Sequence, residues 1–260
     1  MLNKIIFVLF CCSMTACATS PTGRSQFIYM SDTQMNQMGL QAFDDLKKQK
    51  PQTKNTRYNQ FAHCVADAIT HETGGEWEVV IFEDDSLNAF ALPAKKIGIH
   101  TGLIKLVDNQ DQLATIIGHE IAHVLAKHSN ERLSQKTAVS QGVALVGAIS
   151  NPSSTLGQLG LGALGLGAQY GIILPFSRTH ESEADIIGLD LMAKAGFDPR
   201  QSINLWQKMA QASKGQQSAE FMSTHPSHST RIKELSEHMP KAMKFYQQAQ
   251  AITKRPNCRK

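Results

Sequence analysis

The stretch Ile117-Gly118-His119-Glu120-Ile121-Ala122-His123 decides the fold of this 260-residue chain. In a helix, residues four positions apart lie on the same face, so His119 and His123 project together. Two neutral imidazoles at this spacing can bind one divalent metal ion, and Glu120 between them can take a proton from a water held by that ion. The stretch therefore predicts a catalytic zinc helix, although other divalent metals bind the same ligand types.

The residues around this stretch have the pattern of a buried amphipathic helix. Asp108 and Asn109 are suitable N-cap residues. Gly118 inside such a helix costs about 1 kcal/mol in propensity relative to Ala, so we expect another element to pack closely there. This context favours a metal site over two histidines that merely fill a core. Apolar residues recur at about the helical period: Leu113, Ile116, Ile117, Ile121 and Val124.

Two histidines on one helix do not complete a zinc site, which needs a third protein ligand. His128 lies about 180° around the helix from His119, so we interpret it as a surface residue or as a support for a ligand. Glu131 is too close in sequence to the first helix to be a good candidate. The third ligand is therefore expected in a later segment.

Residues 180–189 supply the better candidate. At helical spacing Glu181 and Asp185 lie on one face, and Glu183 points roughly opposite. Glu181 would be the third ligand, and Asp185 could fix the tautomer of a ligating histidine through a hydrogen bond to its second ring nitrogen. Taken alone, the segment would be an exposed acidic helix start, which is favourable to the helix dipole.

These motifs together resemble the M48 peptidases. The resemblance covers about residues 30–240 and is greatest to the soluble periplasmic branch, because the integral-membrane branches carry several strong spanning segments. It implies an α+β, mainly helical, zincin-like metalloendopeptidase with one zinc ion per chain and a small sheet with an edge-strand hairpin before the metal helix. The elements that carry it are residues 88–103, His119-Glu120-x-x-His123, Glu181-x-x-Ala184-Asp185, and His225-Pro226 with Arg231.

The resemblance also implies roles for residues outside the two acidic motifs. His225 could occupy the open zinc position at rest, or could hydrogen-bond the oxyanion in the transition state. Arg231 could serve the oxyanion or orient Asp185. On sequence alone His225 would be an ordinary loop histidine. Three consecutive hairpin residues would contact the substrate: Asn88, Ala89 and Phe90.

The segment before the metal helix has the period of a sheet. Residues 76–82 alternate as a strand, and residues 88–92 and 97–101 form two more on either side of a turn. Pro93 and Gly98 suit an edge strand. Such an edge beside the zinc helix could hold an extended peptide through its free backbone groups, which suits a protease that acts on unfolded segments.

The N-terminal residues have the pattern of a targeting segment. Residues 1–16 resemble a lipoprotein signal peptide, and Met14-Thr15-Ala16-Cys17 resembles a lipobox. We predict cleavage before Cys17 and lipidation of that cysteine, with a plain signal peptide as the alternative. Residues 17–30 would then be a lipidated tether. Ala18 is not the aspartate that often retains lipoproteins at the inner membrane, so we expect the periplasmic face of the outer membrane.

Residues 31–240 are interpreted as one catalytic domain with an unusual insertion. Residues 137–177 contain no charged side chain and are rich in Leu, Gly and Ala. Pro152 and the repeated glycines argue against a spanning helix. We interpret the segment as a mobile apolar lid or substrate groove, with membrane contact as the alternative.

Cys64 and Cys258 remain once the N-terminal cysteines are assigned to the signal and the lipid. In an oxidising periplasm they could pair, or they could both stay free. The net charge of +4 comes from 26 Lys and Arg against 22 Asp and Glu, and residues 241–260 hold basic but no acidic side chains. We therefore expect a solvated, partly disordered basic tail, and no motif indicates nucleic-acid binding.

The function predicted from these features is zinc-dependent hydrolysis of peptide bonds in misfolded or stalled envelope proteins. The expected partners are unfolded or misassembled envelope proteins, with the outer-membrane assembly machinery as a further candidate. One alternative is a chaperone-like periplasmic binding protein with a latched or structural zinc site, and another is an integral-membrane Ste24-like protease. Glu120 favours the enzyme, because a structural zinc site needs no base.

Overall fold

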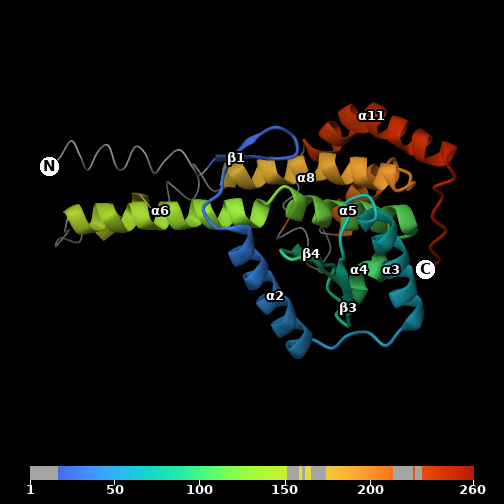
Figure 1. The fold of residues 1–260 in the computed structure, drawn as a ribbon, viewed down its shortest axis with the longest axis horizontal. Helices are drawn as coiled ribbons and strands as arrows, with labels where there is room; N and C mark the ends of the chain where they lie inside the picture. The colour runs from blue at the N-terminus through green and yellow to red at the C-terminus, as the bar shows by residue number, and fades with distance from the viewer. Residues whose placement is uncertain (1–16, 151–157, 160–161, 165–173, 213–224, 226–229) are drawn as a thin grey trace.

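Helix α5 (Gln110–Leu125), which carries the metal motif, lies in the middle of the structure (Figure 1). The structure is a computed structural model that describes residues 17–150, 158–159, 162–164, 174–212, 225 and 230–260. The other elements in chain order are β1 (Cys17–Thr19), β2 (Ser25–Phe27), α2 (Asp32–Gln49), α3 (Thr56–Thr70), β3 (Glu78–Phe82), β4 (Ala89–Leu92), β5 (Lys96–His100), α4 (Thr101–Leu106), α6 (His128–Ser150), α8 (Leu174–Lys194), α9 (Gln201–Ala212) and α11 (Arg231–Ala251).

Three helices begin at residues whose side chains cap them, and of the two cap candidates for α5 the structure uses Asn109. The Asn109 side chain accepts hydrogen bonds from two backbone amides at the start of α5. Ser31 and Gln34 form a capping box on α2, and Asn55 caps α3. Each cap satisfies amide groups that have no partner inside the helix.

Helix α5 is buried along almost its whole length, against α3, α8, α9 and β4. Its apolar face joins the main hydrophobic core. The expected close approach at Gly118 is to α8, because a Cβ added at Gly118 would lie 2.8 Å from the carbonyl oxygen of Gly188. The two helices that hold the candidate metal ligands are therefore in backbone contact.

The three-stranded sheet has the order β3-β5-β4, with β5 parallel to β3 and antiparallel to β4. Strand β4 is an edge strand and contacts α5, as the hairpin pattern predicts. Pro93 follows β4, at the edge. The prediction for Gly98 was wrong: it lies in the central strand β5, where the Phe90 ring fills the space that a Cβ would need.

Both ends of the described chain are tied to the body. Strands β1 and β2 form an antiparallel hairpin, and Arg24 in that hairpin pairs with Glu131 of α6 and Glu183 of α8. At the other end, α11 continues to Ala251, and a disulfide joins Cys64 to Cys258 with a Cα–Cα distance of 5.6 Å. Residues 17–30 are thus more than a tether, and the basic tail is ordered rather than disordered.

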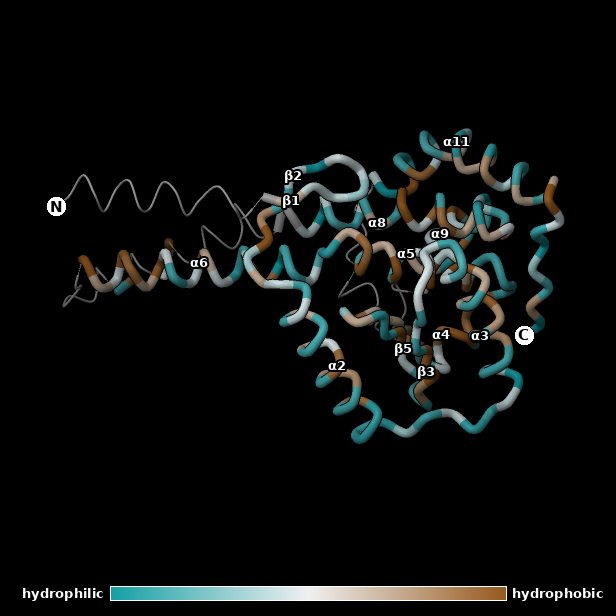
Figure 2. The backbone as a smooth tube through the Cα atoms, viewed as in Figure 1, coloured by the Kyte–Doolittle hydropathy of each residue, from teal (hydrophilic) through white to brown (hydrophobic). Residues whose placement is uncertain are grey.

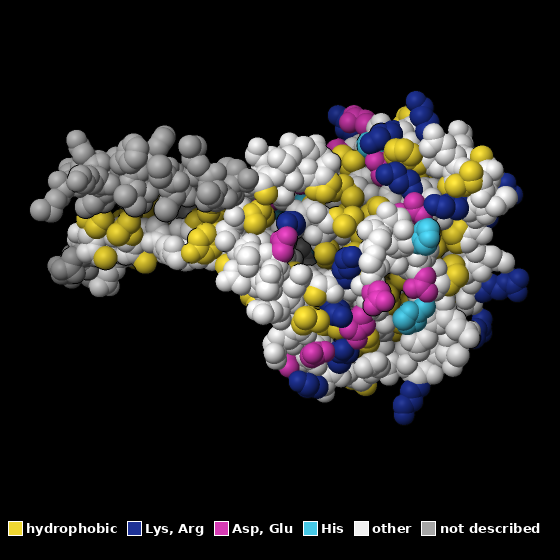
Figure 3. Space-filling view, viewed as in Figure 1, with side chains coloured by type: hydrophobic (Ala, Val, Ile, Leu, Met, Phe, Trp, Pro, Cys, Tyr) yellow, Lys and Arg dark blue, Asp and Glu magenta, His cyan; other side chains and the backbone are white. Residues whose placement is uncertain are grey.

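Helix α6 extends away from the body, and its far part is hydrophobic (Figures 1 and 2). Leu145, Val146 and Ile149 are exposed there, and hydrophobic side chains are visible along this helix in Figure 3. The first part of the predicted lid, up to Ser150, belongs to helix α6. Most of the remainder of the predicted lid lies outside the described residues, as does the predicted signal peptide, residues 1–16. Among the helices that the structure describes, none has the length and hydrophobicity of a membrane span.

Candidate metal centre

Four side chains converge at the middle of α5. His119 Nε2 and His123 Nε2 lie 3.0 Å apart, and Glu181 of α8 places its carboxylate oxygens 3.2 Å from His119 Nε2 and 3.6 Å from His123 Nε2. His225, between α9 and α11, places Nδ1 3.3 Å from His119 Nε2 and 3.1 Å from Glu181. One donor atom from each lies within 4.8 Å of all the others.

This donor spacing fits a small tetrahedral ion. Zinc–nitrogen bonds of about 2.0–2.1 Å put the donors of a tetrahedral site roughly 3.3 Å apart, and the distances above fall around that value. Two imidazoles and a carboxylate are also a ligand set of catalytic zinc sites. The donor set therefore fits a resident zinc ion, with His225 in the position that a catalytic site keeps for water.

Glu120 is buried beside these ligands without being one of them. Its Oε2 accepts a hydrogen bond from the Ala91 amide of edge strand β4, at 3.1 Å. Within the described part of the chain, its Oε1 makes no hydrogen bond, and it lies 3.4 Å from His225 Nε2. Burial raises the pKa of Glu120, which suits a carboxylate that must take up a proton.

The second nitrogen of His119 is held by an acid, as the Glu181/Asp185 spacing predicts. Asp185 Oδ1 lies 3.0 Å from His119 Nδ1, and Arg231 donates two hydrogen bonds of 2.6 Å to Asp185. Arg231 is 2% exposed and stacks on Trp206. Of the two roles considered for Arg231, the geometry favours the orientation of Asp185.

These neighbours set the charge of the ligands in the metal-free protein. Burial alone would lower the pKa of His119, but the hydrogen bonds to Asp185 and Glu181 outweigh it and raise the pKa to about 9. Burial, together with the nearby His119, holds the pKa of His123 well below its usual range. In the metal-free protein these shifts favour the protonated form of His119 and the neutral form of His123.

His123 is supported by His128, which was one of the two interpretations of His128 that the sequence left open. His128 is buried, and its Nδ1 lies 2.8 Å from His123 Nδ1. On its other side His128 Nε2 contacts Glu183, which is paired with Arg24. Helical spacing predicts that Glu183 points away from Glu181. The residues around Arg24 in the sequence do not indicate that Arg24 pairs with Glu183.

The three predicted substrate residues lie on or next to β4 and do not share one environment. Asn88 is buried just before the strand. Ala89 faces the main core beneath the strand, whereas Phe90 packs on the opposite side against Phe43 and Phe82. The Phe90 side chain is thus turned away from the metal ligands, and the strand meets the site through the backbone of Ala91.

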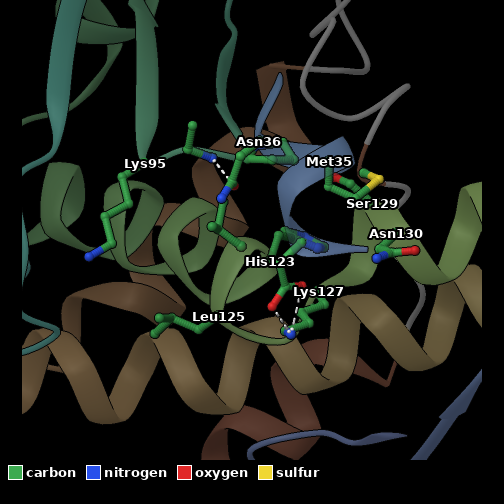
Figure 4. A pocket seen from close by; sticks show the side chains of 12 residues that line it. Met35, Asn36, Lys95, His123, Leu125, Lys127, Ser129 and Asn130 are labelled. Carbon is green, nitrogen blue, oxygen red and sulfur yellow. Dashed lines mark hydrogen bonds and ion pairs between the residues drawn. The ribbon is translucent and has the colours of Figure 1, made fainter. Parts of the chain in front are cut away.

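A cavity of about 420 Å³ opens beside His123 (Figure 4). It lies between α2, the turn after β4 and the α5–α6 junction. The Asp32 carboxylate and the Lys127 ammonium group form an ion pair of 2.7 Å at its wall. The apolar part of the lining is formed by five residues: Met35, Pro93, Ala94, Val124 and Leu125.

A buried H-E-x-x-H helix beneath an edge strand, with a glutamate ligand from a later helix, defines a zincin-type metallopeptidase fold. The chain belongs to peptidase family M48, whose family profile matches residues 51–239. It is 39% identical over 177 residues to the mitochondrial metalloendopeptidase OMA1 of Schizosaccharomyces pombe, covering 67% of this chain and 50% of that protein.

Two further relatives cover more of this chain. It is 32% identical over 215 residues to the beta-barrel assembly-enhancing protease of Yersinia pestis, covering 80% of this chain and 42% of the relative. It is 30% identical over 259 residues to the human metalloendopeptidase OMA1, covering 93% and 49%. The chain therefore spans about half the length, or less, of these curated relatives.

Proposed function

We propose that this chain is a zinc metalloendopeptidase that cleaves unfolded polypeptide segments. The observation that carries the proposal is the position of Glu120, a buried carboxylate with one oxygen free of hydrogen bonds in the described structure, next to a complete set of zinc donors. A site that only stabilised the fold would gain nothing from burying this carboxylate, because burial of an ionisable group is costly.

The chemistry assigned to the residues follows from their positions. A bound zinc ion supplies a Lewis acid that lowers the pKa of a water molecule to about 7. Glu120 takes the proton from the attacking water and returns it to the leaving amine. Asp185, held by Arg231, keeps the proton of His119 on Nδ1 so that Nε2 faces the metal position.

The substrate backbone is proposed to lie along β4. Among the described residues no strand pairs with the outer edge of β4, and β4 contacts Glu120 through Ala91, so an extended peptide added to it would pass next to Glu120. Such pairing uses main-chain groups and requires the target segment to be unfolded. The cavity beside His123 would receive a side chain of this peptide.

His225 is proposed to be a latch that keeps the resting site closed. Its Nδ1 lies at the fourth donor position, which the attacking water needs, so it must move before catalysis. This observation also supports the second candidate function, a latched binding protein that holds unfolded segments without cutting them.

The deciding experiment is cleavage of an unfolded protein by wild type, Glu120→Gln, His225→Ala and, as a control, the exposed Glu237→Gln, with bound zinc quantified in each. We expect loss of cleavage in Glu120→Gln with zinc retained, faster cleavage in His225→Ala, and no change in Glu237→Gln. Zinc-loaded wild type and His225→Ala that bind the unfolded protein and leave it intact would favour the binding protein.

We further propose that the protein works in the periplasm, attached to the outer membrane through lipidated Cys17, on misassembled envelope proteins and beside their assembly machinery. The lipobox-like Met14-Thr15-Ala16-Cys17 supports this, and so does similarity to a protease named for beta-barrel assembly. Metabolic labelling with a fatty acid, compared between wild type and Cys17→Ser, tests the anchor. Equal labelling of both proteins would contradict it.

A further inference from the structure

A buried ionic cluster lies behind His123, on the Nδ1 side of its ring. Arg24 forms two parallel hydrogen bonds with Glu131, of 2.8 and 2.7 Å, and two with Glu183 Oε2, of 3.0 and 2.9 Å. The carboxylates are 1% and 4% exposed. Burying two carboxylates is costly unless a cation pairs with them, and Arg24 supplies a cation that contacts both.

The direction of the hydrogen bonds from this cluster to the metal site is fixed by chemistry. His123 uses Nε2 toward the other donors, so as a ligand it carries its proton on Nδ1 and donates it to His128 Nδ1, 2.8 Å away. His128 Nδ1 then accepts, and its own proton is on Nε2. That proton is donated to Glu183 Oε2 at 3.1 Å. Only this order satisfies all three groups.

Arg24 reaches the cluster from the hairpin β1–β2, 86 residues before the first residue of the metal helix, Gln110. Two further side chains of the hairpin bind the same region. Thr22 donates a hydrogen bond to Glu183. Gln26 donates to the carbonyl of Ala126 at 2.6 Å and to Glu131 at 2.9 Å. The hairpin is therefore attached to the segment that carries His128.

We propose that His128, Glu183 and Arg24 form a positioning relay that fixes the ring and tautomer of His123, and that the hairpin β1–β2 thereby sets the metal affinity of the site. The inference rests on the proposed function only in taking the site to bind zinc. Each ligating histidine would then be backed by a carboxylate that an arginine holds: Asp185 with Arg231 for His119, and Glu183 with Arg24 through His128 for His123.

The first test compares His128→Asn with His128→Leu in the full chain. Both variant side chains have four heavy atoms branched at Cγ and lose the contact with Glu183, but Asn keeps an oxygen on Cγ, where His128 has Nδ1, that can accept from His123. Zinc affinity is measured by competition with a chromophoric chelator, and thermal unfolding of the metal-free protein is measured in parallel. We expect about a 10–100-fold loss of affinity for Leu and a clearly smaller loss for Asn, at similar metal-free stability.

The second test uses Arg24→Gln and Arg24→Lys, with Arg200→Gln as the control. Arg200 is an exposed arginine paired with Asp198, away from the metal donors. We expect Arg24→Gln to weaken zinc binding about tenfold or more, Arg24→Lys to restore part of it because the charge remains, and Arg200→Gln to leave it unchanged. This pair keeps the proposal testable if His128→Leu fails to fold.

The proposal is overturned if the Asn and Leu variants bind zinc equally, or if the Arg24 variants lose stability but keep wild-type affinity. Either result would make the cluster purely structural. The readout is metal affinity rather than activity, so a protein that binds zinc and cleaves nothing would contradict the proposed function and leave this test intact.

Discussion

The carbonyl oxygen of Gly188 occupies the place where Gly118 would otherwise carry a side chain. A Cβ on Gly118 would lie 2.8 Å from that oxygen, and a Cβ on Gly188 would lie 2.7 Å from the amide nitrogen of His119. This contact sets the distance between α5 and α8, and with it the distance from the two histidines to Glu181.

Gly118→Ala is therefore expected to destabilise the protein although alanine is the better helix former. Forcing the helices apart costs about 1–3 kcal/mol, and zinc affinity should fall as Glu181 moves. Gly142→Ala is the matched control, because Gly142 is in helix α6 and no atom of the described residues lies within 4 Å of its Cβ position, so the change there should stabilise by about 0.5–1 kcal/mol. Chemical denaturation of the metal-free proteins gives both values, and equal effects would contradict the close-contact interpretation.

Arg231→Gln is expected to be strongly destabilising, because it leaves Asp185 buried without its cation. Breaking a buried pair in this way costs about 3–5 kcal/mol, and the misoriented Asp185 should also weaken zinc binding. Urea denaturation and zinc competition measure the two effects. Arg231→Gln together with Asp185→Asn should recover part of the stability, and a double variant no more stable than the single would argue against the pairing.

Glu131 should make the fold sensitive to acid. Burial opposes its ionisation, but hydrogen bonds from Arg24, His180 and Gln26 outweigh it and lower its pKa from 4.5 to about 2. The stability from this shift is present above pH 4.5 and is lost as the pH falls toward 2, at about 1.4 kcal/mol per pH unit. The stability gap between wild type and Glu131→Gln should therefore narrow from pH 7 to pH 3 in denaturation experiments, and a constant gap would contradict this shift.

Filling the cavity beside His123 should change which peptides are cleaved. Leu125→Trp places a larger side chain in the cavity wall, so peptides with a large apolar residue near the cleaved bond should lose about tenfold or more in kcat/KM. Peptides with alanine there should be cleaved as before. Ile252→Trp, at an exposed position, serves as the control. If Leu125→Trp lowers kcat/KM equally for both peptide types, the cavity does not bind a substrate side chain.

Much of the metal centre was predictable because its signals are local. His119 and His123 share a face of one helix with Glu120 adjacent to it, and Glu181 and Asp185 share a face of another, so helical periodicity alone orders them. The caps Ser31, Asn55 and Asn109 likewise act within a few residues of themselves. The edge hairpin before the metal helix was also predicted, since strand alternation and Pro93 are local features.

The sequence by itself thus predicted which residues of α5 and α8 converge at the candidate metal centre, because their positions follow from spacing within single elements. Only the tertiary structure decided that Gly98 lies in a central strand, that Cys64 meets Cys258, and that Arg24 and His128 stand behind His123. These contacts join residues on different elements, so no helical or strand periodicity predicts them. Buried charged residues are paired only after those elements have packed together. The support of the metal site is therefore a property of the packed chain.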